Sequence, residues 1–386
     1  MILVNSTKKE DFAEVLALIN HVFGKENTSI NMEDIFTDLL CKDNMEHMRI
    51  MKADGKPVSV INYIINEIDI NGCIMKAANI GAVCTHEDYR CRGYSNLILK
   101  DCLEKMRKEG VDFLYVSGDI SLYTKNNIHK AGKMYKFNID KNYLAEHKES
   151  YNEKCEVKEC SQEDFYLLSS LYDEEAVKFI RDKQRFFDLA SRVPGASVFN
   201  NTAKFFRIEE GGQMQGYFIC SVSPKENGDF KMDIIEYAGN RKSVLAGIIK
   251  TMVQLNSASI SGYTSWFDTD MVKTLEENKI KTETSNYPGT MRIINFTKLM
   301  QKLKPLYAQE KMLGSIEFCE ADGKYIIRSG NMKLEIENDK TMHSLFLGND
   351  MELPEIEHMK ENDTLFDMLK LILPIPVPYP YSLNYI

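Results

Sequence analysis

The residues Ile80-Gly-Ala-Val-Cys-Thr85 and Tyr89-Arg-Cys-Arg-Gly-Tyr-Ser95 form the most informative segment of this 386-residue sequence. An apolar run ends at Thr85, a short polar loop follows, and Gly93 opens a segment with apolar residues at helical spacing. A strand, a glycine-containing turn and a helix in this order leave backbone N–H groups unpaired at the positive end of the helix dipole. Arg90 and Arg92 add two charges beside them. The segment therefore predicts a site for a pyrophosphate group.

The spacing Arg90-x-x-Gly93-x-Ser95 resembles the acyl-CoA loop, Q/R-x-x-G-x-G/A, of the GCN5-related N-acetyltransferases (the GNAT family), although Ser95 replaces the usual Gly or Ala. A strand precedes the loop, and a second strand, Asp112 to Gly118, follows the helix. The alternative is an ordinary strand–helix–strand crossover with a solvated arginine pair. The resemblance implies that acetyl-CoA contacts Val83 and Thr85 on the strand, Arg90, Cys91, Arg92, Gly93, Tyr94 and Ser95 on the loop, and Ser117 or Gly118 near the pantetheine.

Composition narrows the class of protein. The apolar fraction of 44% and the charged fraction of 27% are those of a globular protein, and the formal net charge of −9 argues against a general nucleic-acid binder and suits a cationic substrate. The nine cysteines form no C-x-x-C pair, so we expect reduced thiols in a cytoplasm and no metal site. No apolar stretch is long enough for a membrane span, and the N-terminus has no signal-peptide core.

The element order of the first 150 residues is that of an acetyltransferase domain. A strand at Ile2 to Asn5 is followed by a helix with apolar residues from Phe12 to Phe23 on one face, and then by hairpins at Asp54-Gly55 and Gly72. The loop described above and its helix come next. We expect a mixed sheet that opens beside the cofactor.

Tyr123 follows the second strand of this region, where GNAT enzymes carry a tyrosine before Gly-Phe or Gly-Tyr. The matching step here is Asn127-Ile128, and Asn tolerates the left-handed conformation that Gly would supply. The alternative for Tyr123 is a tyrosine of the hydrophobic core. A phenol stays protonated at neutral pH and can donate its proton to a leaving thiolate, so we expect Tyr123 to act as general acid in an acetyl transfer that needs no metal.

Residues 151–290 show the same order of predicted strands and helices as the first 150 residues, although the two sequences are not repeats of each other. A helix begins at Ser161, three strands follow, and Gly239 to Ser243 leads into a helix from Val244 to Leu255. Gly239 is present, but the Arg-x-x-Gly-x-Gly loop is not. We read this region as a degenerate acetyltransferase-like domain that has lost cofactor binding; the alternative is an unrelated α/β domain.

Residues 291–386 have a third pattern. Alternating strands meet at the hairpin turn Asp322-Gly323, a helix covers Leu365 to Leu373, and the chain ends in Leu373-Pro-Ile-Pro-Val-Pro-Tyr-Pro-Tyr-Ser-Leu-Asn-Tyr-Ile386. Four of the ten prolines fall within seven residues of this tail. Such a tail is stiff and extended, and it is too apolar to be disordered.

The three regions together resemble the enhanced intracellular survival (Eis) family of N-acetyltransferases. The expected fold is therefore α/β (α+β), with a GNAT domain in residues 1–150, a degenerate GNAT-like domain in 151–290, and a sterol-carrier-protein-like α/β domain in 291–386 whose tail returns to the active site. In that family the α-carboxylate of the last residue is the general base, so the resemblance implies Ile386 as base opposite Tyr123 as acid. The alternative is a C-terminus that only packs on a neighbouring sheet.

Two functions from different classes remain open from the sequence. The first is an acetyl-CoA-dependent N-acetyltransferase acting on an amine of a cationic small molecule or a lysine side chain, in a homo-oligomer that the resemblance implies to be a hexamer. The second is a non-catalytic module that binds CoA or lipid as a sensor. Tyr123 and the Arg90–Gly93 loop favour the first; Ser95 and Asn127 keep the second open.

Overall fold

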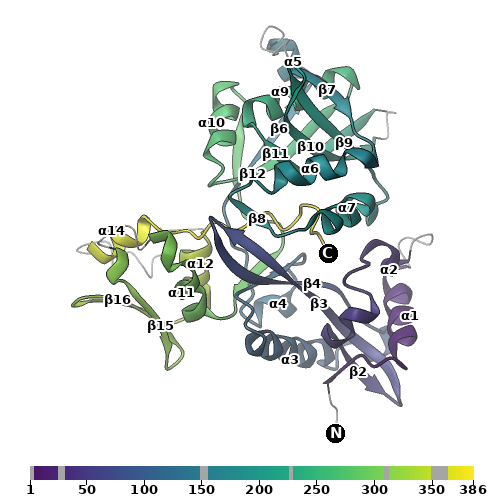
Figure 1. Ribbon diagram of the computed structural model, residues 1–386. Coiled ribbons are helices and arrows are strands. Elements are labelled where there is room, and N and C mark those ends of the chain that lie inside the picture. Colours follow the sequence, from purple (N-terminus) through teal and green to yellow (C-terminus); the bar gives the residue numbers. More distant parts are fainter. Residues whose placement is uncertain (1–3, 25–30, 148–154, 226–228, 308–312, 349–363) are drawn as a thin grey trace. The chain divides into compact units, whose positions relative to one another are not determined.

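The computed structural model describes residues 4–24, 31–147, 155–225, 229–307, 313–348 and 364–386 (Figure 1). Contacts divide the chain into two compact units. The first contains Met1–Gly132, Tyr287–Val377 and Ile386, and the second contains Lys133–Asn286 and Pro378–Tyr385. None of the described helices has the length and apolar character needed to cross a membrane.

The main sheet of the first unit is mixed. Its strand order is β1-β2-β3-β4-β5-β14, and β4 and β5 are its only parallel neighbours among these described strands. The strands are β1 Val4–Ser6, β2 Met48–Ala53, β3 Lys56–Ile70, β4 Cys73–Thr85, β5 Phe113–Val116 and β14 Thr290–Ile293. The helices around them are α1 Phe12–Phe23, α2 Met32–Ile35, α3 Tyr94–Lys108 and α4 Ser121–Thr124, with 3₁₀ turns η1 Lys42–His47 and η2 Glu87–Tyr89.

Helix α3 covers this sheet because its apolar residues recur at helical spacing. Ile98, Leu99, Cys102 and Met106 are buried and pack in one core cluster with side chains of β3, β4 and β5. The helix connects two strands that run parallel, as a strand–helix–strand crossover requires. The predicted helix after the phosphate loop is therefore present and is held by the core.

The C-terminal part of the first unit has a small antiparallel sheet of its own. Its elements are α11 Phe296–Tyr307, η4 Leu313–Ser315, β15 Glu317–Ala321, β16 Lys324–Ser329, β17 Met332–Ile336, α12 Asp339–Leu347 and α14 Thr364–Lys370. The hairpin turn predicted at Asp322-Gly323 joins β15 to β16, and both residues have positive φ, 53° and 73°. This pair of conformations fits the right-handed twist of a two-residue hairpin.

The second unit is built on one seven-stranded sheet in the order β13-β6-β12-β11-β10-β9-β7. Its strands are β6 Met134–Asp140, β7 Cys155–Glu159, β9 Thr202–Glu210, β10 Gln213–Pro224, β11 Phe230–Gly239, β12 Ser259–Ser265 and β13 Thr282–Ser285, with a short strand β8 Val177–Phe179. Its helices are α5 Lys141–Glu146, α6 Phe165–Tyr172, α7 Lys183–Arg192, α8 Pro194–Ser197, α9 Arg241–Gln254 and α10 Thr269–Glu277, with the 3₁₀ turn η3 Gln162–Asp164. Again one neighbouring pair, β11 with β12, is parallel, and α9 connects it.

The two main sheets follow the same plan but exchange one strand. In each, an antiparallel meander (β2-β3-β4 or β9-β10-β11) leads through a helix to a parallel strand, β5 or β12. The next strand beside β5 is β14, which comes after the second unit in sequence, and the next strand beside β12 is β6, which comes directly after the first. The first sheet therefore includes β14 from beyond the second unit, and the second sheet includes β6 from the segment directly after the first.

Because of this exchange, the two compact units do not coincide with the domains 1–150, 151–290 and 291–386 expected from the sequence. The expected domain 1–150 includes residues 134–140, yet these residues pair with β12 and β13 of the second unit. The segment Pro378–Tyr385 of the tail also belongs to the second unit, whereas Ile386 belongs to the first. A division into consecutive stretches of sequence cannot describe such a fold.

We predict that residues 1–150 expressed alone will not unfold cooperatively, because β5 loses the ladder from Thr290 to Ile293 and β6 loses both neighbours. A matched chain would join residues 1–132 directly to 287–377, since the Tyr287 N–H donates to the Ala131 carbonyl at 3.1 Å. Thermal melts followed by circular dichroism compare the two. A sharp transition in the 1–150 chain would contradict the prediction.

Candidate active site

Strand β4 continues beyond the end of its neighbour β5. The two strands pair from Ala77 with Phe113 to Ile80 with Val116, whereas β4 runs on to Thr85. On its other side β4 stays paired with β3 through a β-bulge that puts Ala82 at φ 48°. From Gly81 onward the β5 side of β4 therefore has no ladder partner among the described strands, and its backbone groups can pair with an extended ligand.

The loop from Arg90 to Ser95 leads from this strand into α3. Cys91 and Gly93 have φ values of 62° and 77°, and Gly93 is the N-cap residue of α3. A Cβ built on Gly93 would meet no atom within 4 Å, so a ligand can approach the backbone there. Four N–H groups at the start of a helix have no partner within the helix, which makes this a place for an anion.

The two arginines of the loop are exposed and are held by neutral groups. Arg90 Nε donates to the Thr85 carbonyl at 3.2 Å, and Arg92 donates to the Asp88 carbonyl at 2.9 Å while its guanidinium lies 4.9 Å from the centre of the Tyr89 ring. Neither guanidinium forms a salt bridge with any residue that the structure describes. Both charges are therefore available to a ligand beside the helix start.

Ser95, Thr85 and Ser59 form a chain of hydroxyl groups that ties the loop to the sheet. Thr85 Oγ1 lies 2.9 Å from Ser95 Oγ and 2.7 Å from Ser59 Oγ. The Ser95 hydroxyl is thus engaged with the strand, which explains how a serine fits where the resemblance expects Gly or Ala. The side chains of Val83 and Tyr94 pack against the core, so these two residues offer a ligand mainly their backbone groups.

Tyr123 lies in α4 and is 5% exposed. Its ring packs against Gly118 just after β5, where an added Cβ would lie 2.9 Å from Tyr123 Cε2. Burial raises the pKa of Tyr123 to about 12, so the phenol is protonated at neutral pH. No hydrogen bond joins its hydroxyl to another described residue. Asn127 has φ 57°, the left-handed conformation that the sequence predicts for it.

The chain end lies at the β-bulge of β4. A Cβ built on Gly81 would lie 3.2 Å from the terminal carbonyl carbon of Ile386 and 2.9 Å from Leu39 Cδ2. Gly81 is the first residue of β4 beyond the last pair with β5, and Ser117 and Gly118 are the first residues beyond β5. Ile386 and Tyr123 therefore contact the residues at which the two parallel strands stop pairing.

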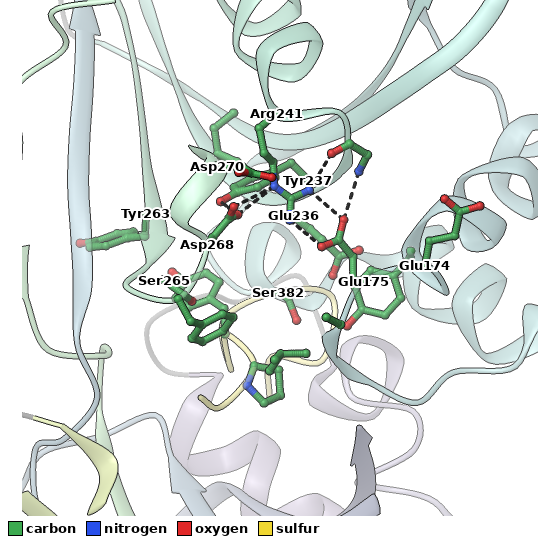
Figure 2. A pocket seen from close by; sticks show the side chains of 18 of the residues that line it. Glu174, Glu175, Glu236, Tyr237, Arg241, Tyr263, Ser265, Asp268, Asp270 and Ser382 are labelled. Carbon is green, nitrogen blue, oxygen red and sulfur yellow. Dashed lines mark hydrogen bonds and ion pairs between the residues drawn. The ribbon is translucent and has the colours of Figure 1, made fainter. Parts of the chain in front are cut away.

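The corresponding loop of the second unit is filled by the protein's own side chains. Gly239 has φ 99° and precedes α9, but its N–H donates to Glu175 Oε1 at 3.1 Å. Arg241 at the helix start donates to both oxygens of the same carboxylate and to Asp268 (Figure 2). A carboxylate of the protein thus accepts from the backbone and the arginine at this helix start, where the sequence lacks the Arg-x-x-Gly-x-Gly pattern.

A cavity of about 490 Å³ lies beside this loop within the second unit (Figure 2). Arg241 is the one guanidinium among its lining residues. The lining carboxylates and aromatic rings are Glu174, Glu175, Glu236, Asp268 and Asp270, with Tyr172, Tyr237, Tyr263, Phe267 and Tyr379. Pro378 and Ser382 of the tail complete the wall. An acidic cavity with aromatic walls suits an organic cation. Spacing along the sequence offered no signal for it, because its residues come from distant segments.

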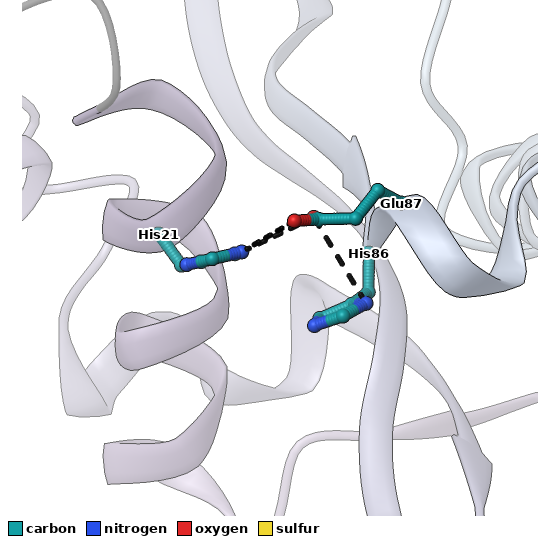
Figure 3. Close-up of side chains that lie close together, drawn as sticks. All are labelled: His21, His86 and Glu87. Atoms are coloured by element: carbon teal, nitrogen blue, oxygen red, sulfur yellow. Dashed lines mark hydrogen bonds and ion pairs between the residues drawn. The ribbon is translucent and has the colours of Figure 1, made fainter.

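His21, His86 and Glu87 form a small exposed cluster near the loop (Figure 3). His21 Nε2 lies 3.1 Å from both carboxylate oxygens of Glu87, and His86 Nδ1 lies 3.9 Å from one. The two imidazoles are stacked with an interplanar angle of 13°, so their nitrogen lone pairs lie in separate, nearly parallel planes. His86 Nδ1 also accepts from the Asp88 N–H. This geometry favours two imidazoles sharing a carboxylate over a metal centre, which needs converging lone pairs.

Comparisons with known proteins place this geometry in context. The family model described as an acetyltransferase (GNAT) domain matches residues 4–126. The chain is similar in structure to a GCN5-related N-acetyltransferase from Anabaena variabilis ATCC 29413 (TM-score 0.66, 12% identity, 99% of both chains covered). It is also similar to Eis1 from Mycobacterium abscessus (TM-score 0.63, 9% identity, 100% of both chains covered). A comparison with curated proteins gave no match.

A further similar structure is that of a conserved protein from Enterococcus faecalis V583, named a probable N-acyltransferase (TM-score 0.66, 16% identity, 98% of this chain and 97% of the other covered). At these identities the structural likeness concerns the fold, which extends over the whole chain. Residues 4–126 are therefore an acetyltransferase (GNAT) domain, and the mixed α/β architecture of the whole chain is shared with solved GCN5-related N-acetyltransferases.

Proposed function

We propose that this protein transfers the acetyl group of acetyl-CoA directly to an amine of a cationic small molecule or lysine side chain, with Tyr123 as general acid and the α-carboxylate of Ile386 as general base. The observation that carries the proposal is the contact of the chain end with Gly81, where β4 passes the end of β5. Tyr123 packs on Gly118, at the matching point of β5. One proton donor and one proton acceptor at this pair of strand ends are what amide formation needs.

Acetyl-CoA supplies an activated thioester, and the residues around the start of α3 fit its diphosphate. Arg90 and Arg92 offer two exposed charges, and the backbone at Gly93 is open. The edge of β4 beyond Ile80 can pair with the amide groups of the pantetheine. At the start of α9 in the second unit, Glu175 already neutralises Arg241, which favours the first unit as the place of the cofactor.

The proton transfers follow from the chemistry of the two groups. The Ile386 carboxylate removes a proton from the ammonium form of the substrate, so that the neutral amine can form the new N–C bond. Tyr123 donates its hydroxyl hydrogen to the sulfur as the C–S bond breaks. The nitrogen loses its second proton as the amide forms, and this proton returns to the tyrosinate. Because burial raises the pKa of Tyr123 to about 12, the hydroxyl remains a donor throughout the neutral range.

The acidic cavity of the second unit supports a cationic substrate. Arg241 pairs with Glu175 and Asp268, and the buried Arg181 pairs with Glu236. With Glu174 and Asp270 the five lining carboxylates still outnumber these two guanidinium groups, so the cavity is negative, in the same sense as the net charge of −9. A polyamine, an aminoglycoside or a lysine-bearing peptide has the charge to enter it.

The test is a thiol-release assay with acetyl-CoA over a panel of polyamines, aminoglycosides and lysine peptides, together with isothermal titration of acetyl-CoA. We expect tight binding of acetyl-CoA and turnover with at least one cationic amine. Binding of acetyl-CoA without turnover on any amine of the panel would instead favour the non-catalytic CoA-binding module.

We also propose three further features that the Eis-like resemblance implies: a sterol-carrier-protein-like C-terminal domain, a cytoplasmic location and a homo-oligomer. The antiparallel sheet β15-β16-β17 with α12 and α14 is compatible with a sterol-carrier-protein-like domain. All nine cysteines are free thiols, which suits a reducing cytoplasm. Native mass spectrometry tests the expected homo-oligomer, a hexamer by resemblance; a monomer at micromolar concentration would contradict it.

Replacing Arg90 or Arg92 with glutamine is expected to weaken acetyl-CoA binding by about 10- to 100-fold each, the worth of a hydrogen bond to a charged group. The unfolding temperature should stay nearly unchanged, because both side chains are exposed. Lys108→Gln, at the other end of α3, removes one exposed charge away from the loop and serves as the control. If titration gives all three variants the same affinity for acetyl-CoA, the loop from Arg90 to Ser95 is not the binding site of its diphosphate.

Gly81→Ala is expected to lower kcat by tens of fold, because the new methyl group would lie 2.9 Å from Leu39 Cδ2 and 3.2 Å from the Ile386 carbonyl carbon and must displace the chain end. The affinity for acetyl-CoA should be retained. Gly195→Ala is the matched control: its methyl group would meet Tyr385 of the same tail at an ordinary 3.7 Å. If both variants keep wild-type kcat, the position of the chain end is irrelevant to turnover.

A further inference from the structure

A buried guanidinium in the second unit binds the last residues of the tail. Arg181 is 3% exposed and forms a two-pronged ion pair with Glu236, Nη1 to Oε1 at 3.0 Å and Nη2 to Oε2 at 2.8 Å. The other N–H groups of Arg181 donate to two residues that lie more than 200 positions later in the sequence. Nε donates to Asn384 Oδ1 at 2.7 Å, and Nη2 donates to Ser382 Oγ at 3.2 Å.

Glu236 and the neighbouring aromatic rings complete this arrangement. The Tyr217 hydroxyl donates to Glu236 Oε1 at 2.9 Å, and the Leu383 N–H donates to Oε2 at 3.4 Å. The Tyr172 ring lies 4.0 Å from the Arg181 guanidinium, close enough for a cation–π interaction. Figure 2 shows Glu236 and Ser382 facing the same cavity. The ion pair therefore forms hydrogen bonds with the tail backbone at Leu383 and with the side chains of Ser382 and Asn384.

The residue between the two polar anchors is apolar and fully buried. Leu383 is 0% exposed and belongs to the core cluster of the second unit that contains Phe186 and Tyr217. Ser382 to Tyr385 form a turn, closed by the Tyr385 N–H donating to the Ser382 carbonyl at 3.1 Å, so polar anchoring at Ser382 and Asn384 and apolar anchoring at Leu383 hold this turn on more than one side. After Asn384 only two residues remain, and the terminal carboxylate can move by no more than about 7 Å from it.

A buried ion pair is an expensive way to gain stability alone. Removing two charges from water costs about as much as their attraction returns, and apolar residues of similar size often stabilise a fold equally well. The pair here also satisfies donors and acceptors of a segment near the chain end. Its geometry is thus better explained by the position that it gives the tail than by the stability of the second unit.

We propose that the Arg181–Glu236 ion pair is a clamp that fixes Ser382–Asn384 and thereby positions the Ile386 carboxylate for proton transfer. This inference rests on the proposed function, in which that carboxylate is the base. Arg181 and Glu236 are positioning residues, since they act on the reaction only through the tail.

The test acts from the tail side, so that the ion pair itself stays intact. The double variant Ser382→Ala/Asn384→Leu removes both hydrogen bonds to Arg181. Ser382→Thr keeps a hydroxyl at the same place and serves as the rescue variant. Thr251→Val serves as the stability control, because it removes a buried hydrogen bond, Thr251 Oγ1 to the Gly247 carbonyl at 2.8 Å, in α9 of the same unit.

Two readouts are measured on the full chain. The first is the rate at which a carboxypeptidase releases Ile386 from the native protein, followed by mass spectrometry. The second is steady-state kinetics with the best amine, as kcat, KM for acetyl-CoA and the pH profile of kcat. For the double variant we expect release to be at least about tenfold faster, the loss of one charged hydrogen bond or more. We also expect kcat to fall at least tenfold, with the acidic limb of its pH profile shifted and KM for acetyl-CoA unchanged.

Ser382→Thr should keep wild-type release of Ile386, and Thr251→Val should keep both wild-type release and wild-type kcat. Unchanged release of Ile386 in the double variant overturns the clamp, whatever its activity. Faster release with unchanged kcat shows that the clamp holds the tail but overturns the role of the terminal carboxylate, and with it the base of the proposed mechanism. The failure of the clamp and the failure of the proposed function thus give different results.

Discussion

Replacing Tyr123 with phenylalanine is expected to lower kcat by about 100- to 10,000-fold, the usual contribution of a general acid. The thiolate of CoA would then leave without a proton donor. The ring would still pack on Gly118, since only the hydroxyl is removed. Affinity for acetyl-CoA, measured by isothermal titration, should therefore remain within a few-fold of wild type.

Tyr63→Phe is the matched control for this experiment. Tyr63 is a buried tyrosine of the same core cluster, and its hydroxyl donates to Glu109 away from the strand ends. Its phenylalanine variant should keep wild-type turnover. Because burial raises the pKa of Tyr123 to about 12, ionisation of the phenol should not reduce the wild-type rate below about pH 11. Unchanged turnover in Tyr123→Phe with the best amine would show that the acid is another group.

Converting the terminal carboxylate of Ile386 to an amide is expected to reduce kcat by a similar factor, about 100- to 10,000-fold. The amide is nearly the same size as the carboxylate but cannot accept a proton at neutral pH. Protein ligation gives this variant, and adding a few residues after Ile386 gives a second one that also moves the charge. In both, circular dichroism should show a folded protein and titration should show normal binding of acetyl-CoA.

Ile386→Val supplies the control, because it keeps a terminal carboxylate on a β-branched residue and should retain most activity. Full turnover in the amidated protein would exclude the terminal carboxylate as the base. It would say nothing about Tyr123, whose role is tested by Tyr123→Phe. The two experiments therefore assign acid and base separately.

The local features of the first domain could be derived from consecutive residues. The helix from Tyr94 to Lys108, its burial of Ile98 and Leu99, and the left-handed Gly93 all depend on neighbours within a few positions. The same holds for the positive φ of Asn127 and for the Asp322-Gly323 hairpin. Periodicity and turn chemistry specify such features because the interactions that form them are short in sequence.

The parts of the candidate site that the sequence did not reveal come from distant segments. Glu175 reaches Gly239 and Arg241 across more than 60 residues, and Arg181 reaches Asn384 across 203. Nothing distinguishes these two residues from the other charged residues along the chain. The acid and base assigned to Tyr123 and Ile386 remain predictions, which the experiments above address.

The sequence by itself determined the strand, glycine turn and helix around Gly93 and the hairpin at Asp322-Gly323, because each follows from propensity, periodicity and turn chemistry over a short stretch. The tertiary structure decided which half of the chain each strand joins. β14 pairs with β5 and β6 with β12, since hydrogen bonds of a sheet edge can be satisfied by any strand of suitable pattern, wherever it lies in the sequence. It also decided that the chain end rests on Gly81, because close packing at that glycine depends on residues that meet only in the folded chain.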